Sequence, residues 1–267
     1  MKTGVYVNSE RTKKSGLAEE FASFLQAKGF DCKTVSAPLS AELGDIGMLF
    51  VLGGDGTILH CAEPCARNGV KIVGINFGTL GFLAEFEKDE IESVPRFLRE
   101  IEEGKTAEIK RRLLKITYKS REFFALNEAA IRRDYSVKDG RMLKADILVN
   151  GYEFDVLSGD GALVSTPTGS TAYSLSAGGP IISPQTPALL YTPLCAFSLA
   201  ARPVVFSDGD KIDIKVTRGG AFLLADGVVC ANVEEGDAVS AEISDLYAAF
   251  PTRSFTGFYK KVRKKLG

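Results

Sequence analysis

A buried strand, a glycine-rich turn and the start of a helix follow one another in the first third of the sequence. The apolar run Met48–Leu52 ends directly in Gly53-Gly54-Asp55-Gly56-Thr57, and helix-forming residues come next. Glycines let a backbone approach a ligand closely, and N–H groups at the start of a helix bind anions. The sequence therefore predicts a phosphate site formed by Gly53, Gly54, Gly56 and Thr57.

The acid in this turn is unusual, because a carboxylate repels a phosphate. Asp55 needs separate chemistry there, such as accepting a proton or bridging to the phosphate through a metal ion. The alternative is an ordinary Asp-Gly turn with a solvated side chain. The sequence contains no P-loop pattern and no dinucleotide fingerprint after its first strand. We therefore expect a less common phosphate-handling architecture.

The pattern of apolar residues changes near residue 110. Before that point, strand patterns such as Val5–Val7 and Lys71–Ile75 alternate with helical ones, which is typical of a parallel sheet covered by helices on both faces. After it, short strand patterns are separated by turn residues such as Asn150-Gly151. The expected fold is an α/β domain followed by a mainly β domain. The expected limits are residues 1–108 and 109–250, with the tail 251–267 returning to the first domain.

Two segments of the β half carry polar groups where strand patterns end. One runs from Ser165 to Ser176 through hydroxyl and glycine residues, with a helix start at Ser170 or Thr171. Such groups suit phosphate oxygens or the edge of a base. The other is Asn127-Glu128, an amide and an acid suited to a ribose diol. Taken alone, each segment is also compatible with a capped loop or a solvated turn.

Composition excludes several classes of function. The 33 basic and 34 acidic residues give a net charge of −1, which is no electrostatic footprint for nucleic acid. No apolar run approaches the roughly 20 residues of a membrane span, and we expect the start of the sequence to form a first strand rather than a signal peptide. The scattered cysteines and the single histidine, His60, form no metal-ligand pattern. We therefore expect a cytoplasmic protein without a metal site built from side chains.

Together, and in this order, the segments resemble the NAD kinase family, particularly its bacterial type. The resemblance covers roughly residues 50 to 230 and rests on Gly53–Thr57, Asn127-Glu128 and Ser165–Ser174, with a further glycine-rich turn at Asn76–Leu83. The first block is shared with lipid kinases and, more distantly, with phosphofructokinases. The run Thr-Pro-Thr-Gly-Ser-Thr-Ala-Tyr is far more specific.

The resemblance implies transfer of the terminal phosphoryl group of ATP, or of another phosphate donor, to the 2′-hydroxyl of the adenosine ribose of NAD. Asp55 would accept the proton of that hydroxyl, and a divalent ion, usually Mg²⁺, would accompany the donor. A homodimer or homotetramer is implied as well. The residues that the resemblance assigns to NAD are Asp55, Gly56, His60, Asn127, Glu128, Arg141, Asp160, Thr171, Ala172, Tyr173, Ser174, Leu175 and Ser176.

Some positions depart from the family pattern. Ser158 stands where many relatives carry an arginine, two residues before Asp160. For His60, contact with a phosphate and a plain position on a helix surface both stay open, and the alignment of Arg141 with a family ligand is open too. Two other functions also remain: a lipid or sugar kinase with the same turn, and a non-catalytic dinucleotide sensor, against which the retention of Asp55 counts.

Overall fold

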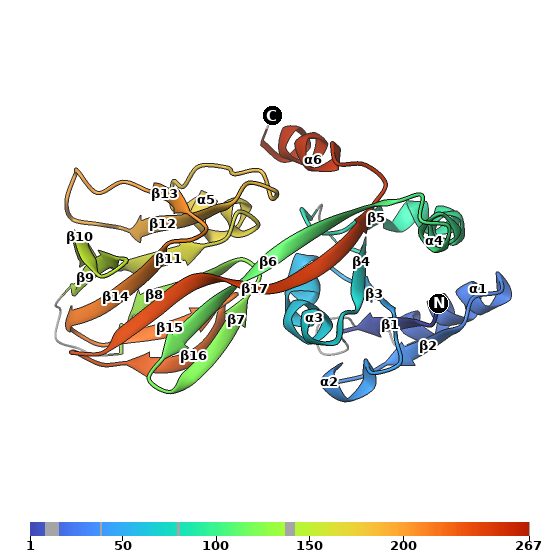
Figure 1. Ribbon diagram of the computed structural model, residues 1–267, viewed down its shortest axis with the longest axis horizontal. Coiled ribbons are helices and arrows are strands. Elements are labelled where there is room, and N and C mark those ends of the chain that lie inside the picture. Colours follow the sequence, from blue (N-terminus) through green and yellow to red (C-terminus); the bar gives the residue numbers. More distant parts are fainter. Residues whose placement is uncertain (9–15, 38, 79–80, 137–141, 267) are drawn as a thin grey trace. The chain divides into compact units, whose positions relative to one another are not determined.

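The chain folds into two compact units in the computed structural model, which describes residues 1–8, 16–37, 39–78, 81–136 and 142–266. The first unit contains residues 1–111 and 246–267, and the second contains residues 112–245 (Figure 1). The C-terminal segment, red in Figure 1, thus belongs to the same unit as the first hundred residues.

A five-stranded parallel sheet forms the centre of the first unit, with the strand order β2-β1-β3-β4-β5. Each residue of the central strand β3 is fully buried, which explains its unbroken apolar sequence. The strands are β1 (Thr3–Val7), β2 (Cys32–Val35), β3 (Met48–Leu52), β4 (Lys71–Asn76) and β5 (Phe86–Glu87). The helical elements are α1 (Leu17–Ala27), α2 (Leu39–Glu42), α3 (Asp55–Asn68), the 3₁₀ helix η1 (Lys88–Ser93), α4 (Val94–Glu102) and α6 (Gly257–Leu266).

Helices cover both faces of this sheet. Val73 and Ile75 of β4 pack in one apolar cluster with residues of α1 and α4. Because successive strand residues point to opposite faces, Gly74 faces the other side. A Cβ atom on Gly74 would lie 2.4 Å from the Cδ1 atom of Ile58, so α3 packs on that second face. The predicted parallel α/β domain is confirmed.

Two six-stranded sheets make up the second unit, although residues 107–111 of one strand and residues 246–252 of another belong to the first unit. Their strand orders are β10-β9-β14-β17-β6-β7 and β13-β12-β11-β8-β15-β16, and pairs such as β8 with β11 and β9 with β14 are antiparallel. The strands are β6 (Ala107–Tyr118), β7 (Arg121–Ala125), β8 (Glu128–Arg133), β9 (Leu143–Val149), β10 (Tyr152–Gly159), β11 (Gly161–Ser165), β12 (Ala188–Leu194), β13 (Val204–Ser207), β14 (Lys211–Arg218), β15 (Ala221–Ala225), β16 (Val228–Val233) and β17 (Ala238–Thr252). The predicted mainly β domain is therefore confirmed.

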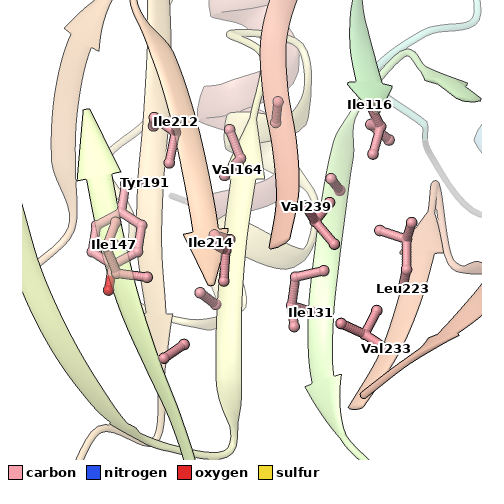
Figure 2. Close-up of a cluster of buried hydrophobic side chains, with 14 of the residues drawn as sticks. Ile116, Ile131, Ile147, Val164, Tyr191, Ile212, Ile214, Leu223, Val233 and Val239 are labelled. Atoms are coloured by element: carbon pink, nitrogen blue, oxygen red, sulfur yellow. The ribbon is translucent and has the colours of Figure 1, made fainter. Parts of the chain in front are cut away.

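One apolar cluster joins the two sheets of this unit. Ile147 of β9 and Ile214 of β14 come from the first sheet, and Ile131 of β8 and Val164 of β11 come from the second (Figure 2). This packing is that of a sandwich, in which each strand turns alternate residues into the core. The turn predicted at Asn150-Gly151 joins β9 to β10, and both of its residues have positive φ angles, as a tight hairpin requires.

Two helix starts differ from the expected positions. Helix α3 begins at Asp55, within the glycine-rich turn and not after it, because Gly54 is extended and occupies the N-cap position. The segment after Ser165 forms only a 3₁₀ turn, η2 (Gly169–Thr171), and one short helical turn, α5 (Tyr173–Ser176). The backbone of Ala172, at φ −106° and ψ −126°, separates them. Within the described residues, no helix has both the length and the apolar character of a membrane span.

Candidate active site

The glycine-rich turn connects β3 to α3 in the first unit. A Cβ atom on Gly53 would lie 2.6 Å from the hydroxyl oxygen of Thr57, so the close packing of this turn requires glycine. Two of its N–H groups are already used: Gly53 donates to the carbonyl of Ile75, and Thr57 donates to the carbonyl of Gly54. Asp55 occupies the first turn of α3, where the helix dipole favours a negative charge.

The carboxylate of Asp55 is held by the loop between β4 and β5. It accepts the N–H of Phe82 at 2.7 Å and that of Leu83 at 3.0 Å. A Cβ atom on Gly81 would lie 2.2 Å from Oδ1 of Asp55, so this contact requires a glycine at position 81. Two backbone donors and a glycine thus fix the orientation of the acid, a pairing across 27 residues that the sequence did not predict.

Two cationic side chains of the first unit interact electrostatically with Asp55. Burial lowers the pKa of Arg111 to about 10, and the neighbouring Asp55 and Glu85 carboxylates oppose that shift. Burial also lowers the pKa of Lys261 on α6, again against the attraction of Glu85 and Asp55. Two cations therefore lie near two carboxylates, which limits the electrostatic repulsion between this site and a phosphate.

In the second unit, Asp226 organises the Asn127-Glu128 pair. Its carboxylate accepts the N–H groups of Leu126 at 2.7 Å, Asn127 at 2.8 Å and Glu128 at 3.1 Å. Burial raises the pKa of Asp226, and these three N–H groups act in the opposite direction. The sequence motifs do not predict Asp226 as a site residue. The signal was an Asp-Gly turn between two strand patterns, and Asp226 indeed has a φ of +47° in the β15–β16 turn.

Glu128 carries an unsatisfied polar atom in a buried position. Its side chain is only 6% exposed, and within the described residues its Oε2 atom has no hydrogen-bond partner. Burial, followed by the charge of Asp226, raises the pKa of Glu128 to about 8, while the N–H of Tyr173 opposes the shift. Ser165 of β11 pairs in register with Glu128 of the neighbouring strand β8, and its hydroxyl also has no partner among the described residues. Such atoms are available to a ligand.

The hydroxyl-rich segment packs directly on the Asn127 backbone. The hydroxyl of Thr166 donates to the carbonyl of Leu126 at 2.6 Å, and its N–H donates to the carbonyl of Asn127 at 2.8 Å. A Cβ atom on Gly169 would lie 2.2 Å from that Asn127 oxygen. The second unit therefore brings the two predicted segments together. Ser174 is fully buried and shares a hydrogen bond with Thr192, whereas the side chain of Tyr173 is exposed.

The remaining predicted residues are more dispersed. His60 is exposed on α3 and stacks on the ring of Tyr6 at 6.1 Å between centroids. Asp160 follows β10 and raises the pKa of the Cys195 thiol by a hydrogen bond. Arg141 lies outside the described residues. Within the part of the chain that the structure describes, no three His, Cys, Asp or Glu residues are grouped so as to hold a metal ion.

Comparison with known proteins matches both units to one family. The ATP-NAD kinase N-terminal domain matches residues 3–106, and the ATP-NAD kinase C-terminal domain matches residues 126–250. The chain is 35% identical to an NAD kinase of Methanothermobacter thermautotrophicus, covering 100% of this chain and 96% of that protein, and 35% identical to one of Treponema denticola, covering 98% and 95%.

Solved structures agree with this match. An NAD kinase from Archaeoglobus fulgidus in complex with ATP superposes with a TM-score of 0.77 and 26% identity, covering 98% of this chain and 99% of that one. Yeast NADH kinase complexed with NADH has the same fold, with a TM-score of 0.85 at 24% identity, covering 100% and 87%. The resemblance inferred from the motifs is confirmed, and the chain belongs to the NAD kinase family.

Proposed function

We propose that this chain transfers the terminal phosphoryl group of ATP to the 2′-hydroxyl of the adenosine ribose of NAD, giving NADP, with Asp55 as the proton acceptor. The observation that carries this proposal is the carboxylate of Asp55, held by two backbone N–H groups at the start of a helix beside a glycine-rich turn. An alcohol is a weak nucleophile, and a positioned carboxylate accepts its proton as the bond to phosphorus forms.

The turn itself supports the phosphate end of this reaction. Gly53 and Thr57 use their N–H groups within the fold, so the proposed phosphate contacts narrow to the N–H groups of Gly54 and Gly56. The start of α3 and the nearby cations, Arg111 and Lys261, favour a negatively charged ligand. These features together suit phosphoryl transfer, in which positioning and charge stabilisation supply most of the catalysis.

We assign NAD recognition to the second unit. Asn127 and Glu128 would hold the dinucleotide, and the segment from Thr171 to Ser176 would hold its adenosine part. A mostly protonated Glu128 offers a hydrogen-bond donor as well as an acceptor at neutral pH, which matches a ligand hydroxyl. Asp160 is proposed at the nicotinamide end. His60 and Arg141 complete the proposed set.

A divalent ion, Mg²⁺, would enter with the phosphates of ATP. No cluster of three ligating side chains occurs in the described residues, and Mg²⁺ in kinase sites binds through one or two carboxylates together with substrate phosphates. The ion would supply charge neutralisation on the donor. We further propose that the protein works in the cytoplasm. We also propose that it forms a homodimer or homotetramer, and sedimentation of the purified protein tests this oligomeric state.

A substrate panel tests the proposed activity. The purified protein is incubated with Mg²⁺ and ATP labelled on its terminal phosphate, together with NAD, diacylglycerol or fructose 6-phosphate. Label is expected only in NADP, and an NADP-specific dehydrogenase confirms that product. Label in diacylglycerol or fructose phosphate would favour the alternative kinases, and tight NADP binding without turnover would favour a sensor. Parallel reactions with NADH, other triphosphates and polyphosphate define the acceptor and donor range.

A further inference from the structure

The loop Gly81–Glu85 is held from two sides. On one side, the N–H groups of Phe82 and Leu83 donate to the carboxylate of Asp55. On the other side, the ammonium group of Lys261 donates to the carbonyl oxygen of Phe82 at 3.1 Å and to that of Ala84. The carbonyl of Phe82 and the N–H of Leu83 belong to one peptide group. Lys261 and Asp55 therefore bind opposite ends of the same peptide dipole.

The position of Lys261 costs free energy that a purely structural residue would avoid. Its side chain is half-buried, and this burial lowers its pKa because the charged form loses water. Within the described residues, its ammonium group forms no ion pair shorter than 4.0 Å, and its recorded partners are the two carbonyls. An apolar side chain would fill this space without the desolvation cost. Besides favouring a negatively charged ligand, a cation at this position acts on the loop through the two carbonyls.

The rest of the C-terminal segment holds the same loop. The centroids of the Phe258 and Phe82 rings lie 6.3 Å apart, and the ammonium group of Lys265 lies 4.3 Å from the centroid of the Phe82 ring. At the other end of the loop, Glu85 accepts the backbone N–H of Arg253 at 2.8 Å and its Nε at 3.2 Å. The segment that begins with Arg253 and includes α6, which follows β17 in Figure 1, thus fixes the loop at both ends.

We propose that Lys261 is a positioning residue for Asp55, acting through the Phe82–Leu83 peptide group. Its charge anchors the carbonyl end of that dipole, and the N–H end then holds the carboxylate in the orientation that accepts the proton. A hydrogen bond to the carbonyl oxygen polarises the peptide group, and this strengthens the hydrogen bond that the N–H of the same group donates. This inference rests on the proposed function, because it assigns Lys261 a role in the same reaction.

The variants Lys261→Met, Lys261→Gln and Lys261→Arg test the proposal. Methionine removes both charge and donor, glutamine keeps a neutral donor, and arginine keeps the charge. We expect kcat for NADP formation to fall at least 10-fold in the methionine variant, with KM for NAD within twofold, because a misplaced catalytic group costs up to about 100-fold. The kcat of Lys261→Gln should lie between those of the methionine variant and the wild-type protein, and Lys261→Arg should recover part of the wild-type kcat. Lys260→Met, on the exposed side of α6, is the matched control and should keep kcat within twofold.

The same substitutions made in an Asp55→Asn protein distinguish a positioning role of Lys261 from a general loss of stability. In the Asp55→Asn variant, Lys261→Met should change the residual rate by less than twofold, because no carboxylate remains to be oriented. An equal loss of rate in both backgrounds, or an unchanged kcat in Lys261→Met, would overturn the proposal. If the methionine variant melts below the assay temperature, Lys261→Gln provides the same comparison. Absence of NADP formation by the wild-type protein would instead contradict the proposed function.

Discussion

Replacing Gly81 with alanine places a methyl group against the carboxylate of Asp55. The backbone of Gly81 does not have a positive φ angle, so alanine fits its conformation and only the steric contact changes. The added Cβ atom would lie 2.2 Å from Oδ1 and 2.8 Å from Cγ of Asp55, whereas ordinary contacts begin near 3.4 Å. The carboxylate must therefore retreat by about 1.2 Å, which breaks or bends its bonds to the loop.

This displacement has a calculable effect on the reaction. A 1 Å error in the position of a catalytic group costs about 100-fold in rate, which corresponds to about 2.7 kcal/mol of activation free energy. We therefore expect Gly81→Ala to lower kcat for NADP formation about 100-fold. NAD affinity, measured by calorimetry, should stay within threefold, because Asn127 and Glu128 are untouched.

A glycine in the same loop provides the control. A Cβ atom on Gly78 would have only Asn76 Oδ1 near it, at 3.9 Å, so Gly78→Ala should keep kcat within threefold. Melting temperatures of both variants show whether folding is affected. If Gly81→Ala is folded and keeps a wild-type kcat, the orientation of Asp55 by this loop has no catalytic importance, and the reasoning is refuted.

Three further predictions concern the second unit. Asp226→Ala leaves three N–H groups without their acceptor and should lower the free energy of unfolding by about 3 kcal/mol or more, measured by urea denaturation. Glu128 has a pKa of about 8 in the folded protein and an ordinary pKa of 4.5 when unfolded. Its contribution to the free energy of unfolding is therefore complete below pH 4.5 and is lost as the pH rises from 4.5 through 8. The maximal slope is about 1.4 kcal/mol per pH unit, and Glu128→Gln should flatten the stability–pH curve over that range. Gly169→Ala places a methyl group against the carbonyl of Asn127 and should raise KM for NAD about 10-fold. An unchanged KM would contradict a role of Asn127 in NAD binding.

Local patterns in the sequence predicted the two kinds of unit. The unbroken apolar run of β3 indicates a strand buried on both faces, and the Asn150-Gly151 pair indicates a tight hairpin; both are present. Gly54 and Gly56 favour a turn, so the sequence predicts the start of α3 only after Thr57. In the structure, Gly54 is extended and serves as the N-cap, so the helix already begins at Asp55.

The supporting residues of the site could not be predicted from local patterns. Asp226 binds N–H groups about 100 residues earlier in the chain, and Lys261 binds carbonyls about 180 residues earlier. Each bond joins a side chain to backbone groups, which almost every residue type presents, so no sequence signal pairs Asp226 or Lys261 with its partners. Periodicity and turn residues describe neighbours along the chain, whereas these contacts depend on strand order and on the return of the C-terminal segment.

The most direct measurement compares the wild-type protein with Asp55→Asn in NADP formation from NAD, ATP and Mg²⁺. Asparagine keeps the size of the side chain but accepts a proton poorly, so kcat should fall by about 10²- to 10⁴-fold. NAD binding, measured by calorimetry on the same samples, should be retained. An Asp55→Asn variant that forms NADP at the wild-type rate, or a wild-type protein that forms none, would contradict the assignment of Asp55 as the proton acceptor of an NAD kinase.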